Sequence, residues 1–322
     1  MMAIQFDSER LHKQLGSFIT AGADKPGDAV SDYFRYYGID FENRMTGVSH
    51  QFGHFNSGKY DIVVHYFAHA ESENKKPKGT CFLFHGYFDH AGLYGHLIEY
   101  CLQRDFNVVI YDLPGHGLST GERGSISTFS DYLSVMTDCI KLLTPIAPQP
   151  WHAIAQSTGA AVLMDYELQQ LPAFEKIVLL APLLRAAEWR FIKLAHWVGQ
   201  HFLERVPRRF GVNSNDAEFL QFLEHGDSMQ ARHVSVRWVE AMLRWENRFD
   251  YFEPSEKPIL IVQGQRDTTV DWNYNIPQIR KKFPKAKYMP LQDAHHHLVN
   301  ESAEIRTKLF AAMDLYLLAE GR

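Results

Sequence analysis

The feature that most constrains the fold is a regular alternation of β-rich and helical runs along the chain. The β-rich runs are Tyr60–Phe67, Thr80–His85, Phe106–Asp112, Trp151–Ala155, Lys176–Ala181, Pro258–Gln263 and Lys287–Leu291. The helical runs between and after them are Tyr94–Gln103, Asp131–Leu143, Gly159–Gln170, Tyr274–Lys282 and Ala303–Leu318. Strands that alternate with helices predict a mostly parallel sheet with helices on both faces, an α/β fold.

Two local patterns refine this prediction. The runs Val48–Phe55 and Tyr60–Phe67 are separated only by residues 56–59, which predicts an antiparallel hairpin at the edge of the sheet. Ser130 precedes a helical run and is a suitable N-cap.

The alternation stops between about Leu184 and Glu253, where no strand signal is present. Apolar residues at helical spacing form a first stripe, Phe191, Leu194, Ala195, Val198 and Phe202, and a second stripe, Val234, Trp238, Met242 and Trp245. We interpret residues 184–253 as a helical cap inserted into an α/β core made of residues 1–183 and 254–322. Most of these side chains are expected to pack inside the cap, and the rest to supply apolar walls for an acyl chain.

Basic residues accompany the first stripe. They are Arg185, Arg190, Lys193, Arg205, Arg208 and Arg209. A basic amphipathic surface of this kind could touch anionic lipid, so peripheral membrane contact through the cap is one hypothesis. A solvated helix face is the simpler interpretation.

Composition narrows the class of partner and the compartment. The chain has 322 residues and a net charge of −5, which disfavours nucleic acid as a partner. Its three cysteines show no close-spaced metal pattern and favour a reducing compartment. The first 15 residues do not resemble a secretory signal, and no run approaches the ~20 apolar residues of a membrane-spanning helix. We therefore expect a cytoplasmic protein; the oligomeric state is not indicated.

The stretch Ala155-Gln156-Ser157-Thr158-Gly159 lies between a predicted strand and a predicted helix. A serine on such a sharp turn needs small neighbours, because its backbone is strained and its Oγ must project outward. Gly159 meets that need, and Ala155 replaces the glycine of the usual G-x-S-x-G pattern. The N–H groups that open the helix would face any anion formed at Ser157. An ordinary strand–turn–helix with a serine N-cap is the alternative.

An activated serine needs a base and a carboxylate that orients the base, and the chain offers both in the order Ser, Asp, His. Asp267 follows the predicted strand that ends at Gln263, and His295, His296 and His297 follow the next one. Asp271 lies close enough to compete with Asp267. Adjacent histidines in a loop rarely all reach one ion, so a metal site is not expected.

Four segments resemble the α/β-hydrolase superfamily, and within it the monoacylglycerol lipase and lysophospholipase branch of serine aminopeptidase S33-type hydrolases. They are His85-Gly86-Tyr87-Phe88-Asp89-His90, the D-x-x-G-H-G-x-S loop of residues 112–119, the serine turn, and the pair Gly264–Asp267 with Ala294–Glu301. The resemblance runs from about Phe41 to the C-terminus and is weakest in the cap. In the last segment, His296 followed by Leu298, Val299, Asn300 and Glu301 fits the family pattern, which selects His296 as the base.

The resemblance implies a serine hydrolase that cleaves carboxylic esters through an acyl-enzyme, with monoacylglycerol or lysophospholipid-like substrates and no cofactor. Ser157 would be the nucleophile, His296 the base and Asp267 the residue that orients it. The backbone N–H groups of Tyr87 and Thr158 would form the oxyanion hole, supported by the loop residues His85 and Gly86.

Alternatives remain open at this point. One is an amidase or peptidase with the same fold, and another is an acyltransferase to an alcohol. The third is a non-catalytic binding protein on a hydrolase fold, because a fold alone does not establish chemistry.

Overall fold

The principal sheet of the protein has eight strands and is mostly parallel. The computed structural model describes residues 7–18, 27–71, 76–171 and 173–319. Residues 1–6, which belong to the N-terminal segment predicted not to be a secretory signal, lie outside these ranges. The strands are β1 (Val48–Ser57), β2 (Tyr60–His69), β3 (Thr80–Phe84), β4 (Asn107–Tyr111), β5 (Trp151–Gln156), β6 (Lys176–Leu180), β9 (Ile259–Gly264) and β10 (Lys287–Leu291). They lie in the order β1-β2-β4-β3-β5-β6-β9-β10, antiparallel at β1–β2–β4 and parallel from β4 onward.

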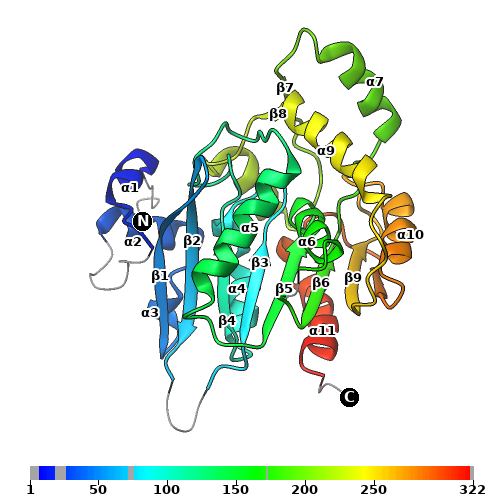
Figure 1. Cartoon of the computed structure of the whole chain (residues 1–322). Helices are drawn as coiled ribbons and strands as arrows, with labels where there is room; N and C mark the ends of the chain where they lie inside the picture. Colours follow the sequence, from blue (N-terminus) through cyan, green and yellow to red (C-terminus); the bar gives the residue numbers. More distant parts are fainter. Residues whose placement is uncertain (1–6, 19–26, 72–75, 172, 320–322) are drawn as a thin grey trace.

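Helices cover both faces of this sheet, as Figure 1 shows. The helices outside the segment between β6 and β9 are α1 (Ser8–Gln14), α2 (Asp28–Tyr37), α3 (Phe41–Arg44), η1 (Ala91–Tyr94), α4 (Gly95–Leu102), α5 (Phe129–Leu143), α6 (Thr158–Leu168), α10 (Trp272–Lys282), η3 (Leu298–Asn300) and α11 (Ala303–Leu317). Every helix in these described ranges is too short or too polar to cross a bilayer.

Alternate strand residues enter two separate apolar clusters, one on each face of the sheet. In β5, Ala153 and Ala155 pack with α5 and α6, whereas Ile154 packs with α4 and α11. Strands buried on both faces explain the continuous apolar runs in the sequence. The sheet is thereby fixed as a rigid support for the loops at the carboxyl ends of its parallel strands.

Two local predictions need correction. The hairpin turn is shorter than predicted, because β1 continues to Ser57, which pairs with Tyr60, and Gly58 adopts a positive φ of 60° in the turn. The N-cap of α5 is Thr128, not Ser130: the Thr128 side chain accepts a hydrogen bond from the N–H of Ser130, which is already inside the helix.

The segment between β6 and β9, hereafter the β6–β9 insertion, is helical with one small sheet. It contains α7 (Trp189–Gly199), β7 (Arg205–Pro207), α8 (Ala217–Gln221), the π-helical turn η2 (Phe222–Gly226), β8 (His233–Ser235) and α9 (Val236–Phe249). The prediction of no strand there was wrong, since β7 and β8 pair antiparallel. Strands this short carry too few residues for a period-2 pattern to appear.

The two apolar stripes of the insertion behave differently. Trp238, Met242 and Trp245 on α9 are buried, but they pack against α5 of the core and not inside the insertion as predicted. Leu194, Val198 and Phe202 are exposed, which contradicts the interpretation that the first stripe packs inside the insertion. In Figure 1, α7 projects beyond the rest of the molecule, with α9 between it and the sheet.

Candidate active site

Ser157 occupies the tight turn between β5 and α6. Its φ of 53° and ψ of −113° are strained for a residue with a side chain. Hydrogen bonds hold the turn in place, from the N–H of Ser157 to the carbonyl of Leu180 and from the N–H of Leu183 to the carbonyl of Ser157. Gly159 is required here, because a Cβ at that position would lie 2.4 Å from the carbonyl oxygen of Phe84. The serine hydroxyl therefore stands at the carboxyl edge of the sheet.

The structure brings Ser157, His296 and Asp267 into one chain of hydrogen bonds. His296 Nε2 lies 3.0 Å from Ser157 Oγ, and His296 Nδ1 lies 2.7 Å from Asp267 Oδ2. All three side chains are buried. Ser157 follows β5, Asp267 follows β9, and His296 follows β10, so the three loops meet at the same edge of the sheet.

Asp267 is fixed by several further donors. Its Oδ1 accepts hydrogen bonds from the N–H of Thr269 at 2.7 Å and of Val270 at 3.2 Å, and its Oδ2 accepts one from the Gln263 side chain at 2.9 Å. The competing candidate, Asp271, instead caps α10 by accepting from the N–H of Tyr274. The geometry thus selects Asp267 over Asp271 as the carboxylate beside His296.

The buried pair shifts both pKa values toward the charged forms. Burial alone would raise the pKa of Asp267, but the charge and hydrogen bond of His296, with the other donors, lower it. Burial alone would lower the pKa of His296, but the attraction of Asp267 outweighs it and raises the pKa above the usual 6.5. The arrangement favours an imidazole whose Nδ1–H donates to Asp267 and whose Nε2 accepts from the serine hydroxyl.

The loop of residues 86–89 lies directly over Ser157. A Cβ on Gly86 would stand 3.2 Å from the Ser157 Cβ and 2.9 Å from Asp89 Oδ2, so the loop approaches the serine closely only because residue 86 is glycine. Tyr87 is the next residue in this loop, and Thr158 opens α6, where its N–H precedes the first helical turn. Both predicted oxyanion-hole residues therefore flank the serine.

The side chain of Tyr87 has a second part in the structure. Its ring stacks on Trp238 of α9 with centroids 3.8 Å apart, and its hydroxyl donates to the carbonyl of Gly124 at 2.6 Å. The loop of residues 86–89 is in this way packed against the β6–β9 insertion.

His85 connects the loop of residues 86–89 to the loop after β4. Its Nδ1 lies 2.8 Å from the Gly86 carbonyl, and its Nε2 accepts a hydrogen bond from the N–H of Leu113 at 2.8 Å. With both ring nitrogens engaged and the side chain fully buried, His85 is suited to support the loop rather than to transfer protons.

The three adjacent histidines point to different partners. His297 Nε2 lies 3.1 Å from Asp89 Oδ1, whose other oxygen accepts from the Tyr94 hydroxyl and from the N–H of Gly86. The backbone N–H of His295 donates to the buried carboxylate of Glu301. Among the described residues no group of His, Cys, Asp or Glu is arranged to hold a metal ion.

A cavity of about 760 Å³ opens onto this constellation. Its walls are mainly apolar and come from the loop of residues 86–89, from α7 and from α9. Ile192 and Ala195 on α7 line the cavity, as does Leu203 just after the helix. Leu194 and Trp197 on α7, and Phe202 after it, are exposed and do not line the cavity. A volume of this size is typical of a site for a small molecule.

Sequence reasoning missed several residues of the site. The Asp89–His297 contact joins positions 208 residues apart, and the Gln263 amide acts from inside a strand. Arg208 was seen only as one of a group of basic residues, yet it lines the cavity. Only the folded structure shows that Arg208 lies at the cavity, because no local sequence pattern indicates it.

Comparison with known proteins identifies the family. Residues 75–303 match the model of the family described as serine aminopeptidase, S33. The chain is 26% identical over 235 residues to phospholipase YtpA of Bacillus subtilis, covering 70% of this chain and 90% of the relative. It is 29% identical over 251 residues to human monoglyceride lipase, covering 75% and 82% of the two chains.

Solved structures agree on the fold. The monoacylglycerol lipase of Paleococcus ferrophilus superposes with a TM-score of 0.67 at 19% identity, covering 80% of this chain and 98% of that one. A soluble variant of monoglyceride lipase from Saccharomyces cerevisiae, in complex with a substrate analogue, gives 0.70 at 15% identity, covering 82% and 93%. The predicted α/β-hydrolase fold and the predicted resemblance are both confirmed, and the chain belongs to the serine aminopeptidase S33 family.

Proposed function

We propose that this protein hydrolyses carboxylic esters of monoacylglycerol or lysophospholipid-like substrates through an acyl-enzyme. The observation that carries the proposal is the hydrogen-bonded series Ser157–His296–Asp267 at an apolar cavity. A nucleophile, a base and a group that orients the base are the parts that acyl transfer needs. The relatives named above are a phospholipase and a monoglyceride lipase, which supports a lipid ester as the substrate.

The geometry accounts for each step. His296 Nε2 takes the proton of Ser157 as Oγ bonds to the ester carbonyl carbon, and Asp267 stabilises the imidazolium that results. The negative oxygen of the tetrahedral intermediate faces the N–H groups of Tyr87 and Thr158. When the intermediate collapses, His296 protonates the departing alcohol. Water then repeats the sequence on the acyl-enzyme and releases the carboxylic acid.

Aminopeptidase activity has less support from the cavity. An aminopeptidase must hold the ammonium group of its substrate, which requires a free carboxylate near the serine. Asp89 is the only carboxylate among the described residues that line the cavity, and it already meets His297, Tyr94 and the N–H of Gly86. Transfer of the acyl group to an alcohol uses the same first step, so product analysis distinguishes it from hydrolysis.

The decisive experiment is active-site labelling. A fluorophosphonate probe is expected to label the wild-type protein covalently and to leave Ser157→Ala unlabelled, because no other hydroxyl is activated by His296. Hydrolysis of monoacylglycerol should fall at least about 10³-fold in the same variant. Equal labelling of both proteins would exclude Ser157 as the nucleophile, whereas labelling of neither protein would favour a non-catalytic binding protein. A preference for amino-acid anilides over lipid esters would favour the peptidase.

The proposal also covers the division of the chain into core and cap, contact with a membrane and the location in the cell. We take residues 184–253 as a cap over a core formed by 1–183 and 254–322, because the insertion supplies much of the cavity wall. The exposed apolar residues of α7, accompanied by Arg190 and Lys193, support peripheral contact with a membrane surface. A cytoplasmic location remains part of the proposal, and the buried, unpaired cysteines are compatible with it.

A further inference from the structure

Arg208 is a cation held inside a mainly apolar cavity. It follows β7 and lines the same cavity as Ser157. Its guanidinium stacks 3.9 Å from the ring centre of Phe88, which belongs to the loop of residues 86–89, and 4.4 Å from that of Phe210. Stacking between aromatic faces fixes the plane of the guanidinium and leaves its edge for hydrogen bonds.

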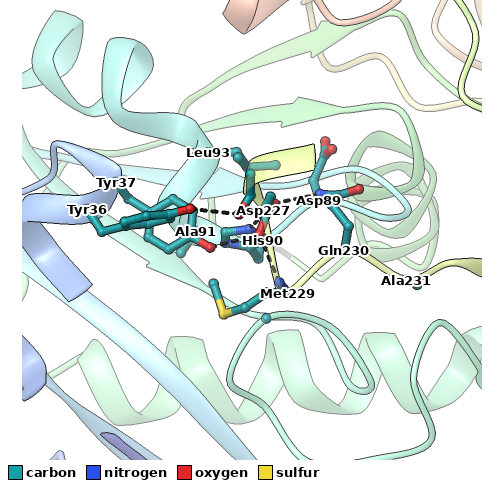
Figure 2. Close-up of polar contacts among 12 residues, drawn as sticks. Tyr36, Tyr37, Asp89, His90, Ala91, Leu93, Asp227, Met229, Gln230 and Ala231 are labelled. Carbon is teal, nitrogen blue, oxygen red and sulfur yellow. Dashed lines mark hydrogen bonds and ion pairs between the residues drawn. The ribbon is translucent and has the colours of Figure 1, made fainter. Parts of the chain in front are cut away.

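A buried polar network fixes the position of this guanidinium. Arg208 Nη1 donates to Gln230 Oε1 at 2.5 Å, and the Gln230 amide donates in turn to Asp227 Oδ2 at 2.9 Å. Asp227 is fully buried and also meets His90 at 2.9 Å and the hydroxyl of Tyr37 at 2.8 Å (Figure 2). The arginine is therefore connected through two side chains to the rigid core of the protein.

What distinguishes Arg208 is the absence of a carboxylate partner. The partly buried arginines Arg104, Arg185 and Arg248 each pair with an Asp or Glu. No Asp or Glu among the described residues lies within ion-pair distance of Arg208, whose hydrogen bonds go only to the neutral oxygens of Gln230 and Ala231. Burial lowers the pKa of Arg208 to about 10, which still leaves it charged at neutral pH.

Among the described residues, the carboxylates of Asp89 and Asp227 attract the guanidinium, but neither lies close enough to form an ion pair with it. Asp89, the one carboxylate among the described cavity residues, has both oxygens engaged. A cation desolvated in this way gains most from an anion that arrives with the ligand, because charge-assisted hydrogen bonds are stronger where water is excluded. A planar guanidinium edge matches the oxygens of a phosphate especially well.

We propose that Arg208 binds an anionic head group of the substrate, a phosphate carried on the glycerol backbone. The inference rests on the proposed ester hydrolysis and sharpens it toward lysophospholipids. Phe88, on which the guanidinium stacks, is next to Tyr87 in the chain, and Tyr87, Ser157 and Arg208 line the same cavity, so one ligand can present its ester to Ser157 and its phosphate to Arg208.

The test compares two esters with one acyl chain, decanoylglycerol and decanoyl-lysophosphatidate, both kept below their aggregation concentrations. Arg208→Gln is expected to lower the kcat/KM ratio of the phosphate ester to the neutral ester by roughly 10- to 100-fold, mainly through KM. Arg208→Lys should lower the ratio less, because it keeps the charge and loses the planar fork. Thermal unfolding of each variant verifies that it is folded.

Arg232→Gln is the matched control. Arg232 also faces the Phe210 ring, at 5.0 Å, but it is exposed and does not line the cavity. Its substitution should change the ratio by less than about twofold. An equal effect of Arg232→Gln and Arg208→Gln would overturn the inference, because it would indicate a diffuse charge effect.

Glycerol phosphate, added to the decanoylglycerol assay, locates the anion. Competitive inhibition that disappears in Arg208→Gln supports a head-group site, whereas noncompetitive inhibition that disappears would indicate a separate anion site and overturn the inference. If the wild type hydrolyses both esters with a ratio that no variant changes, the head-group inference alone fails. If it hydrolyses neither ester, the proposed function itself fails.

Discussion

At the residue scale, two neighbouring histidines have different partners. His296 Nε2 contacts the Ser157 hydroxyl, whereas His297 Nε2 contacts the carboxylate of Asp89. We expect His296→Ala to reduce kcat about 10³-fold or more, because no other base reaches the hydroxyl. His297→Ala should be milder on kcat but should lower the melting temperature, since it leaves the Asp89 carboxylate buried without this partner. His295→Ala provides the control. A dead His297→Ala with an active His296→Ala would mean that the base is one residue later than proposed.

The pKa of His296 gives a second prediction at this scale. Asp267 raises that pKa above 6.5, and the base works only when it is neutral. The kcat/KM for a non-ionising ester should therefore be full at alkaline pH and decline as the pH falls through a midpoint above 6.5. In Asp267→Asn burial would act without the opposing charge, so the midpoint should move to lower pH while kcat falls by about 10³–10⁴. An unchanged midpoint in Asp267→Asn would contradict this account.

At the scale of elements, the Asp227–His90 pair fastens the end of η2 to the loop before η1 (Figure 2). Burial works against both charges, but the two groups and their neighbours lower the pKa of Asp227 to about 2 and raise that of His90 above 6.5. The Asp227 contribution to stability is present above pH 3.8 and is lost as the pH falls through about 2. The His90 contribution is complete below 6.5 and is lost as the pH rises through its raised pKa.

Between those limits the pair should matter most. Asp227→Asn is expected to lower the free energy of unfolding by about 3–5 kcal/mol in denaturant titrations near pH ~5–6, and by less at alkaline pH. The exposed pair Arg244–Glu240 on α9 is the control, and Glu240→Gln there should cost less than about 1 kcal/mol at either pH. Equal losses in the two variants would refute a fastening role for Asp227.

At the scale of the whole molecule, α7 is apolar on the side that lines the cavity and on the side that faces outward. Phe202, just after α7, is 85% exposed, and Leu315 on α11 at the opposite end of the molecule is 82% exposed (Figure 1). Phe202→Glu should weaken binding to anionic vesicles by roughly 10- to 100-fold, because it removes an aromatic ring from the lipid contact and adds repulsion. Leu315→Glu should leave vesicle binding unchanged in the same sedimentation assay. Equal effects would exclude α7 as the membrane-contact surface.

The sequence predicted the parts of this molecule that are encoded locally. Ser157 and Asp267 each follow a buried strand, β5 and β9, and His296 follows the neighbouring edge strand β10, so the topology brings the three residues to one edge of the sheet. Contacts between distant side chains left no such signal: the meeting of Asp89 with His297 and the isolation of Arg208 depend on how the loops fold over one another. The outward face of α7 was misjudged because an apolar stripe looks the same whether protein or another surface covers it.

The carboxylate of Asp89 contacts two parts of the proposed machinery: Gly86 in the loop over Ser157, and His297, the neighbour of the proposed base. Because both parts share this hydrogen-bond partner, a displacement of one part changes the position of the other. Substitutions among the residues of the β6–β9 insertion that line the cavity can therefore change which substrate fits without altering these two contacts.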